Sequence, residues 1–189
     1  MLRSPLLRKF YFGVWKRIYC NDIIGLYEMK NHSKAISPAI LIKEVTSENI
    51  KDALTFQSNH ELVRFQLFLN EGDTGFYAYL HGQCAHRSWV MKHPRQAEIH
   101  LFYSKLLLPN EVFVHFCETA PWARGKNIFT SVLNHIGSVF RDQRILICVE
   151  QSNKSSIRSI KKSGFIEINR FRIIALLGIR IVRNMTISN

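Results

Sequence analysis

The sequence lacks paired cysteines, a signal peptide and a membrane-length apolar run. Its four cysteines show no CxxC spacing and three stand in apolar, strand-like segments, so we expect reduced, buried thiols and no bound metal. Basic residues interrupt the N-terminus where a signal peptide would need its apolar core. The longest apolar run, Ile173 to Val182, contains Gly178 and Arg180 and is too short to span a bilayer. These absences predict a cytoplasmic protein.

Acidic residues are also scarce. The chain has 14 Asp and Glu against 26 Lys and Arg, which gives a net charge of +12. Residues 1–40 carry 7 basic and 2 acidic side chains, residues 41–110 carry 7 of each, and residues 111–189 carry 12 and 5. The basic excess therefore lies at the two ends. Such a surface suits an anionic small molecule, nucleic acid or anionic lipid, and charge alone does not choose among them.

No internal repeat or low-complexity tract interrupts the chain. Its 189 residues, 47% of them hydrophobic, are enough for one well-buried domain. The pattern predicts a strand at Leu41–Val45, a helix toward Gln57, a helix at Glu61–Leu69, a hairpin of Gly75–Leu80 and Cys84–Val90, and a second hairpin of Phe171–Leu177 and Ile179–Val182. This order of strands and helices predicts an α/β layer.

The most informative segment runs from Glu118 to Phe129. The strand-like Val112–Cys117 precedes it, and apolar residues at three-and-four spacing from Ile128 to Phe140 predict an amphipathic helix after it. A helix N-terminus offers free backbone N–H groups and the positive end of a dipole, and the turn adds basic residues and a glycine. The segment predicts a phosphate site. The alternative is that the glycine only serves the turn.

A second strand, Ile145–Val149, leads into a short helix from Lys154 to Ser163. Asn153 stands at the N-cap position, and Gly164 stands where a left-handed residue ends a helix. Two segments together resemble GNAT-type acyl-CoA N-acyltransferases. The first, Pro121–Phe129, resembles the family's pyrophosphate loop, and the second, with Asn153, Ser156 and Lys162–Phe165, resembles its Asn-led helix. The resemblance covers residues 111–165 and extends more weakly back to residue 40.

The resemblance implies a GNAT-like fold, α/β with a mixed central β-sheet flanked by helices. It also implies acetyl-CoA as co-substrate, with the pantetheine arm beside the strand that precedes the loop and the pyrophosphate against the loop amides. The cofactor-binding residues so implied are Phe116, Cys117, Glu118, Thr119, Arg124, Gly125, Lys126, Asn127, Ile128, Phe129, Asn153 and Ser156.

The chain departs from the family's pattern in two places. Trp122, Gly125 and Asn127 occupy three loop positions where the family has Gln or Arg, then Gly, then Gly or Ala. Asn tolerates left-handed backbone conformations, so a cradle of amides survives this change. Many members also have a Tyr that protonates the departing thiolate where this chain has Ile160. These departures leave open the alternative that the protein binds coenzyme A or a partner but has reduced turnover.

Three residues are candidate general bases. Glu111 lies fourteen residues before Gly125, the offset of the basic glutamate in histone-type members of the family, although a strand entrance also suits a solvated carboxylate. His115 is a candidate because imidazole is a common general base, and the alternative is a hydrogen-bonded core residue. Glu118 has the same two interpretations. A covalent mechanism through Cys117 lacks a third orienting group. Strand alternation predicts one face with Val112, Val114, Phe116 and Glu118 and another with Phe113, His115, Cys117 and Thr119.

Residues 1–36 form a separate arm in this interpretation, and residues 37–189 form the acyltransferase domain. Leu6, Phe10, Val14 and Ile18 recur at helical spacing, with Lys and Arg on the remaining surface. A basic amphipathic arm packs on its own domain or on a second subunit of a homodimer, attaches to a membrane surface, or binds nucleic acid. The sequence does not distinguish packing on the domain or a second subunit from attachment to a membrane surface.

The sequence therefore predicts an acetyl-CoA-dependent N-acetyltransferase that acetylates an amine of a small molecule or amino sugar by direct attack. The first alternative is a GNAT-fold protein that binds coenzyme A or a partner and has lost turnover. The second is a basic nucleic-acid-binding module, against which stands the lack of an aromatic-basic recognition motif of the RNP type.

Overall fold

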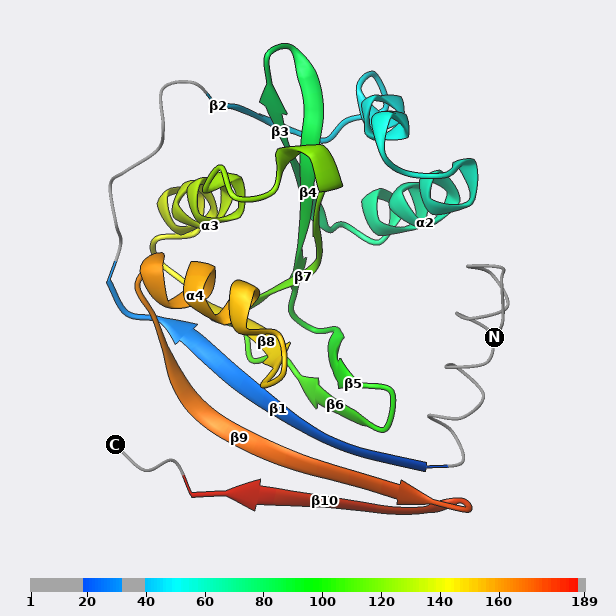
Figure 1. Ribbon diagram of the computed structural model, residues 1–189, viewed down its shortest axis with the longest axis vertical. Coiled ribbons are helices and arrows are strands. Elements are labelled where there is room, and N and C mark those ends of the chain that lie inside the picture. The colour runs from blue at the N-terminus through cyan, green and yellow to red at the C-terminus, as the bar shows by residue number, and fades with distance from the viewer. Residues whose placement is uncertain (1–18, 32–39, 187–189) are drawn as a thin grey trace.

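A single eight-stranded mixed sheet organises the chain. The structure, a computed structural model, describes residues 19–31 and 40–186. The strand order is β10-β9-β1-β8-β7-β4-β3-β2, in which only β7 and β8 run parallel (Figure 1). The strands are β1 (Tyr19–Met29), β2 (Ile40–Glu44), β3 (Thr74–Leu80), β4 (Gln83–Lys92), β7 (Glu111–Thr119), β8 (Arg144–Glu150), β9 (Phe165–Leu176) and β10 (Ile179–Met185).

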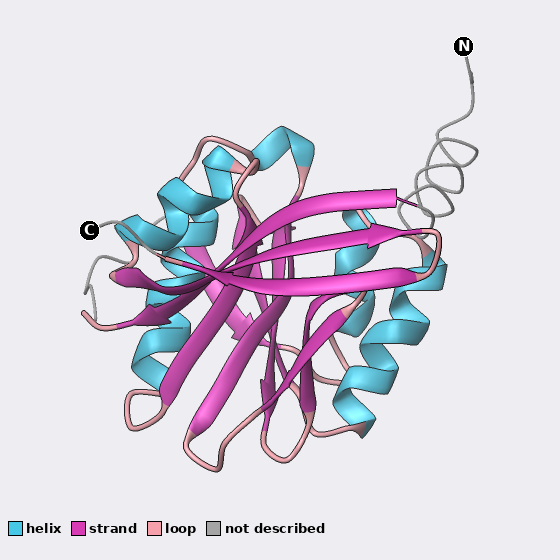
Figure 2. Cartoon of the chain, turned by 90° about the horizontal axis from the view of Figure 1, so that it is seen from below, coloured by secondary structure: helices cyan, strands magenta, loops and turns pink. Residues whose placement is uncertain are grey.

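Helices cover both faces of this sheet. On one face lie α3 (Ile128–Val139) and α4 (Lys154–Lys162), and on the other lie the 3₁₀ helix η1 (Ile50–Thr55) and α2 (Asn59–Asn70) (Figures 1 and 2). The first pair packs on Val112, Val114 and Ile145, whereas the second packs on Tyr77 and Trp89. Because β-strand side chains alternate between faces, the central strands need apolar residues at nearly every position, which is what their sequences contain.

The sequence located most of these elements correctly. The expected α/β sheet, the β3–β4 hairpin, the β9–β10 hairpin and the helices α2, α3 and α4 are all confirmed. Asn153 caps α4 by accepting a hydrogen bond from the Ser156 N–H at 3.1 Å, and Gly164 ends that helix with φ of 85°. The helix expected toward Gln57 is the shorter 3₁₀ segment η1. No described helix is long and apolar enough to cross a membrane.

The N-terminal part of the chain contributes more to the sheet than the sequence suggested. Residues 19–29, expected within a separate arm, form β1, which is hydrogen-bonded to β8 on one side and to β9 on the other. The predicted boundary at residue 36 is therefore wrong for these residues. Two acidic residues and a glycine in YCNDIIGLYEM hide a strand whose two neighbours come from the far end of the sequence. The expected arm helix of residues 1–18 lies outside the described residues.

A small hairpin that the sequence did not reveal lies beside the main sheet. β5 (Gln96–His100) and β6 (Tyr103–Leu106) pair with each other and cover a second apolar cluster on the sheet. That cluster joins Phe113 and Leu146 of the central strands with Phe171 and Ile173 of β9. The hairpin was missed because KHPRQAEIHLFYSKL is too polar and too short to show clean alternation.

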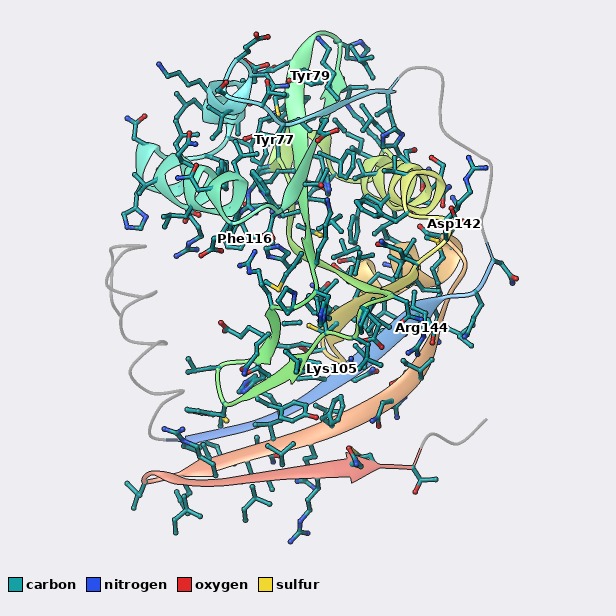
Figure 3. All side chains as sticks on the ribbon, turned by 180° about the vertical axis from the view of Figure 1, so that it is seen from behind. Tyr77, Tyr79, Lys105, Phe116, Asp142 and Arg144 are labelled. Carbon is teal, nitrogen blue, oxygen red and sulfur yellow. The ribbon has the colours of Figure 1, made fainter. Side chains whose placement is uncertain are left out.

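A buried ionic network ties three strands together at one end of the sheet. Arg144 donates to Glu28 of β1 at 2.9 Å and to Glu111 of β7 at 2.7 Å, and Lys105 also contacts Glu111 (Figure 3). The Arg144 hydrogen bond holds the pKa of Glu28 below its ordinary value. Burial raises the pKa of Glu111, but the Lys105 hydrogen bond, the Leu108 N–H and the nearby cations outweigh burial and lower it overall. Both carboxylates are therefore ionised partners of Arg144.

A chain that starts at Ser37 should fail to fold, because β8 and β9 would lose the strand that lies between them. We expect no cooperative unfolding transition by circular dichroism in urea for this shorter chain. A chain that starts at Tyr19 keeps β1 and is the matched comparison. A cooperative transition for the Ser37 chain would instead support the boundary at residue 36.

Replacing Arg144 with Met should lower the free energy of unfolding at pH 7 by about 2 kcal/mol. Breaking a fully buried pair costs about 3–5 kcal/mol, and the 40% exposure of the Arg144 side chain reduces that figure. Because both folded carboxylate pKa values are lowered, their contribution is full above the ordinary value of 4.5 and is lost as pH falls through the folded values. Urea titrations at pH 7 and pH 3 measure this.

The difference between wild type and Arg144→Met should therefore shrink at the lower pH. Arg141→Met, at an exposed position outside the network, is the control and should change stability little at either pH. A pH-independent difference would contradict the ionic explanation.

Candidate functional site

The site is a cleft where two parallel strands separate. β7 and β8 pair from Glu111–Arg144 to Val114–Ile147, and the ladder then stops although both strands continue. The cleft that opens beyond this point has a volume of about 380 Å³. Its walls come from β4, β5, β7, β8, α3 and α4. The lining residues are His86, Glu98, Phe113, Val114, His115, Phe116, Cys117, Glu118, Thr119, Phe129, Ile147, Cys148, Val149, Glu150, Asn153, Ser156 and Ile160.

A β-bulge in β7 accompanies the separation. Phe116 has φ of 51°, in the left-handed region, and the β4–β7 register shifts between the Trp89–His115 and Arg87–Glu118 pairs. Three steps along β7 thus match two along β4, which bends β7. The Arg87 guanidinium donates to the carbonyl oxygen of Phe116 and lies 4.0 Å from its ring centroid. These contacts hold a backbone conformation that is costly for Phe.

The bulge overturns the predicted alternation of β7 side chains. Phe116 lies on the α2 side of the sheet with His115, where both rings pack against Phe68 (Figure 3). Beyond the bulge, Cys117 packs with the α3 and α4 cluster instead. The predicted assignment of Phe116 to the face of Val114 is therefore wrong. Simple alternation has a period of two, and one extra residue inverts every later position.

The loop from Ala120 to Asn127 delivers the chain to the N-terminus of α3. The 3₁₀ turn η2 (Pro121–Ala123) begins it, Gly125 has φ of 79°, and Asn127 is the N-cap of α3 with φ of 56°. Nothing lies within 4 Å of the position that a Gly125 Cβ would take. The first backbone N–H groups of α3 have no partner within a helix, and they converge on this open space.

Three cations belong to the loop before this helix N-terminus or contact it; the Arg124 guanidinium donates to the Thr119 carbonyl oxygen, and the Lys126 ammonium lies over the Trp122 ring. Arg124 and Lys126 come from the loop, and Lys162 of α4 donates to the Asn127 side chain at 3.1 Å. The sequence prediction missed Lys162, whose position shows only once α4 packs beside α3. The arrangement of amides, helix dipole and cations suits a phosphate group. Gly125, Asn127, Ile128 and Phe129 are thus brought together as expected, with Phe129 also lining the cleft.

The start of α4 forms the facing wall of the cleft. Asn153 and Ser156 line it, and Asn153 is held by its capping bonds to the Ser156 N–H and the Ser155 hydroxyl. Ile160, which stands where many GNAT members have a Tyr, is buried and also lines the cleft. The described cleft lining contains no tyrosine. A proton for a leaving group has no tyrosine source at this wall.

His115 combines access to the cleft with an orienting partner. Its Nε2 atom is 3.0 Å from Oδ2 of Asp73, whose carboxylate is buried and also contacts Arg95. A hydrogen bond from Nε2 to an ionised carboxylate leaves Nδ1 as the basic nitrogen. Asp73 follows α2, forty-two residues before His115, so no local pattern predicts this pair.

The other two candidate bases are engaged elsewhere. Glu118 lines the cleft, but its Oε2 atom accepts from Arg87 at 2.8 Å. Glu111 is only 2% exposed, does not line the cleft, and binds Lys105, Arg144 and the Leu108 N–H. It lies at the closed end of the β7–β8 ladder, before the strands separate. The structure therefore separates Glu111 from His115 and Glu118.

Two further cleft residues are held in neutral forms. Burial lowers the pKa of His86 to about 3, and its two ring nitrogens contact the Thr119 and Ser88 hydroxyls at 2.7 Å. Burial raises the pKa of the Cys117 thiol to about 11, which disfavours a thiolate nucleophile. The four cysteines form no disulfide within the described residues, as expected, although Cys117 and Cys148 are only partly buried. His86 was missed because its place in the cleft depends on β4 pairing with β7.

One group of side chains has the composition of a metal site. Ligand atoms of Cys20, Asp22 and His100 lie within 4.8 Å of one another. His100 Nε2 is 3.0 Å from Asp22, and its Nδ1 accepts a hydrogen bond from the Phe102 N–H, so Nε2 carries the proton. A metal would have to displace that proton. The expectation that no metal is bound stays a prediction.

Comparisons with known proteins support the fold. No protein-family profile and no curated protein matches the chain. A GNAT-family acetyltransferase from Colwellia psychrerythraea matches with a TM-score of 0.62 at 13% identity over 88% of this chain. A conserved Staphylococcus epidermidis protein of unknown function matches with a TM-score of 0.61 at 11% sequence identity over 95% of this chain. A GCN5-related glucosamine N-acetyltransferase region of a fungal β-N-acetylglucosaminidase matches with a TM-score of 0.61 at 14% sequence identity over 91% of this chain.

The chain spans 60%, 69% and 23% of the lengths of these three proteins, respectively. At such low identity the likeness concerns the fold. The chain has the fold of GNAT-family acetyltransferases.

Proposed function

We propose that this protein is an acyl-CoA-dependent N-acyltransferase that moves an acetyl group from acetyl-CoA to an amine. The observation that carries the proposal is the cleft between β7 and β8, which is lined by His115 and by Phe129 in the first turn of α3. One end suits a diphosphate and the walls suit an amide-containing chain. A thioester at the inner end of such a ligand would lie beside the candidate base.

The residues present fit coenzyme A in three respects. The N-terminal amides of α3, together with Arg124, Lys126 and Lys162, would hold the pyrophosphate. The peptide groups of β7 beyond Val114 have no ladder partner on β8 and would pair with the amides of the pantetheine arm. Buried Val114, Ile147 and Ile160 supply apolar walls.

The reaction needs a neutral amine and a stabilised oxyanion. In the proposed step the amine nitrogen attacks the thioester carbonyl, a C–N bond forms, and the C–S bond breaks to release the thiolate. Backbone N–H groups of β7 would stabilise the tetrahedral oxyanion. The thiolate needs no dedicated acid, because an unperturbed thiol has a pKa of about 8.5 whereas an alkylammonium has one of about 10. Removal of the amine proton is the heavier demand.

His115 is the base that the geometry favours. Asp73 fixes the ring and leaves Nδ1 free to accept the amine proton, and His115 lines the cleft. Glu118 is paired with Arg87, and Glu111 lies outside the cleft lining. Asp73 acts as a positioning residue, since it reaches the reaction only through His115.

The acceptor class follows from charge at the cleft. Glu98 and Glu118 line it and are at least partly exposed, so they would attract a cationic amine. We propose an amine on a small molecule or amino sugar. One of the matching structures is named as a glucosamine N-acetyltransferase, which agrees with this class.

A coenzyme A-binding protein with reduced turnover is the second candidate. The buried Ile160 in the cleft wall, where a tyrosine acid is common in the family, is the observation in its favour. Tight acetyl-CoA binding without acetylation of a broad amine panel would support it.

Replacing Gly125 with Val should weaken acetyl-CoA binding by about a hundredfold or more. A β-branched residue is strained at φ of 79°, and its side chain would enter the open space beside the α3 amides. Calorimetric titration measures the dissociation constant. Gly82→Val is the matched control, because Gly82 has the same φ of 79° and equally open surroundings in the β3–β4 turn. Equal weakening by both changes would attribute the effect to general strain.

Replacing His115 with Gln should lower kcat/KM about a hundredfold and remove the ascending limb of its pH profile, while acetyl-CoA affinity stays unchanged. Asp73→Asn should cause a smaller loss. His100→Gln is the matched control, because His100 also bonds an aspartate at 3.0 Å but does not line the cleft. The assay follows thiol release with an accepted amine across pH. Full activity of His115→Gln, with a comparable loss in Glu118→Gln, would assign the base to Glu118.

A further inference from the structure

The turn of the β9–β10 hairpin presents large apolar side chains to solvent. Leu176, Leu177 and Ile179 are 51%, 77% and 67% exposed around Gly178. The hairpin lies at the edge of the sheet, since β9 is the only neighbour of β10 among the strands that the structure describes (Figure 1). Isolated exposed apolar residues are ordinary, but three at one protruding turn form a patch that calls for a partner.

The backbone of this turn makes the choice of leucine costly. Leu176 pairs with Ile179, so Leu177 and Gly178 form a tight two-residue hairpin turn. Both have positive φ, 47° for Leu177 and 90° for Gly178. Such turns favour Asn or Asp followed by Gly. A leucine at the first position is conformationally strained and its side chain is exposed, so the folding of the hairpin does not explain why leucine occurs there.

The two strand segments that meet at the turn are basic near it, and Asp22 of the neighbouring β1 is bonded to His100. Residues 168–186 include four arginines and no Asp or Glu. Arg180 stacks on Phe102 at 4.9 Å, and neither Arg180 nor Arg183 forms an ion pair within the described residues. The tip of the hairpin is apolar, and these two arginines follow it along β10. This order matches a bilayer surface, in which apolar acyl chains lie beneath anionic headgroups.

The N-terminus of the chain enters the fold at the same place. Tyr19, itself exposed, pairs directly with Leu176 at the start of β1. Residues 1–18 immediately precede it and carry five Lys and Arg and no acid. The start of β1 and the β9–β10 turn therefore lie side by side at one corner of the sheet (Figure 1).

We propose that the β9–β10 turn and the adjoining start of β1 dock on an anionic membrane surface, with Leu177 entering the lipid and Arg180 and Arg183 contacting phosphates. The inference is independent of the acyltransferase proposal. A second copy of the chain explains an unpaired β10 edge but not a strained leucine at the tip. Nucleic acid explains the arginines but not the apolar side chains.

The test is sedimentation of the full-length protein with vesicles of phosphatidylglycerol mixed with phosphatidylcholine. Wild type should bind these vesicles, bind phosphatidylcholine alone much more weakly, and dissociate at high salt. Leu177→Asn should lower the partition coefficient about tenfold, which is the effect of losing one buried leucine side chain. Because Asn suits the turn, this variant should keep or raise the melting temperature, so misfolding cannot account for the loss.

Charge and position have matched controls. Arg180→Glu combined with Arg183→Glu should lower binding at least as much, whereas Lys51→Glu with Arg141→Glu removes the same charge elsewhere and should cause a smaller loss. Leu67→Asn, at an exposed apolar position of α2, should leave binding unchanged. The proposal is overturned if wild type does not bind anionic vesicles or if Leu177→Asn binds like wild type. It is also overturned if Leu177→Asn only dissolves a dimer seen by analytical ultracentrifugation, or if binding requires RNA.

Discussion

The short β7–β8 ladder is the constraint on which the site depends. Two parallel strands pair over four residues and then part, and the bulge at Phe116 bends β7 away while β4 keeps its other edge paired. Without the separation, the peptide groups beyond Val114 would complete a sheet and no cleft would exist. The same bend sends the chain into the loop that ends at Asn127, so strand geometry also sets where the α3 amides point.

Opening one end of a ladder requires the other end to be firmly closed. The buried network of Glu28, Glu111 and Arg144 does this, since it joins β1, β8 and β7 where the parallel pairing begins. β1 supports β8 along the other edge, opposite the cleft. A carboxylate at Glu111 is thus better explained as a structural anchor than as a base. His115 lies past the anchor, where the strands have separated, and its partner Asp73 arrives from the end of α2.

Local patterns predicted much of this structure because their signals are local. The apolar spacing of residues 128–140 predicted α3, Asn153 and Gly164 predicted the two ends of α4, and the glycine-containing loop predicted an anion site at a helix N-terminus. Other features failed for identifiable reasons. β1 contains two acidic residues and a glycine and has partners over a hundred residues away, and the bulge at Phe116 inverts an alternation that the sequence alone predicts to be continuous.

The sequence by itself determined the α/β class, the order of most elements, the basic ends of the chain and the glycine-containing loop that leads into α3. Each of these rests on propensity, spacing or charge within a few turns of chain. Only the tertiary structure decided that residues 19–29 belong to the sheet, that His115 rather than Glu111 meets the cleft, and that Tyr19 adjoins the β9–β10 turn. Such facts depend on contacts between segments far apart in sequence, which local physical preferences do not encode.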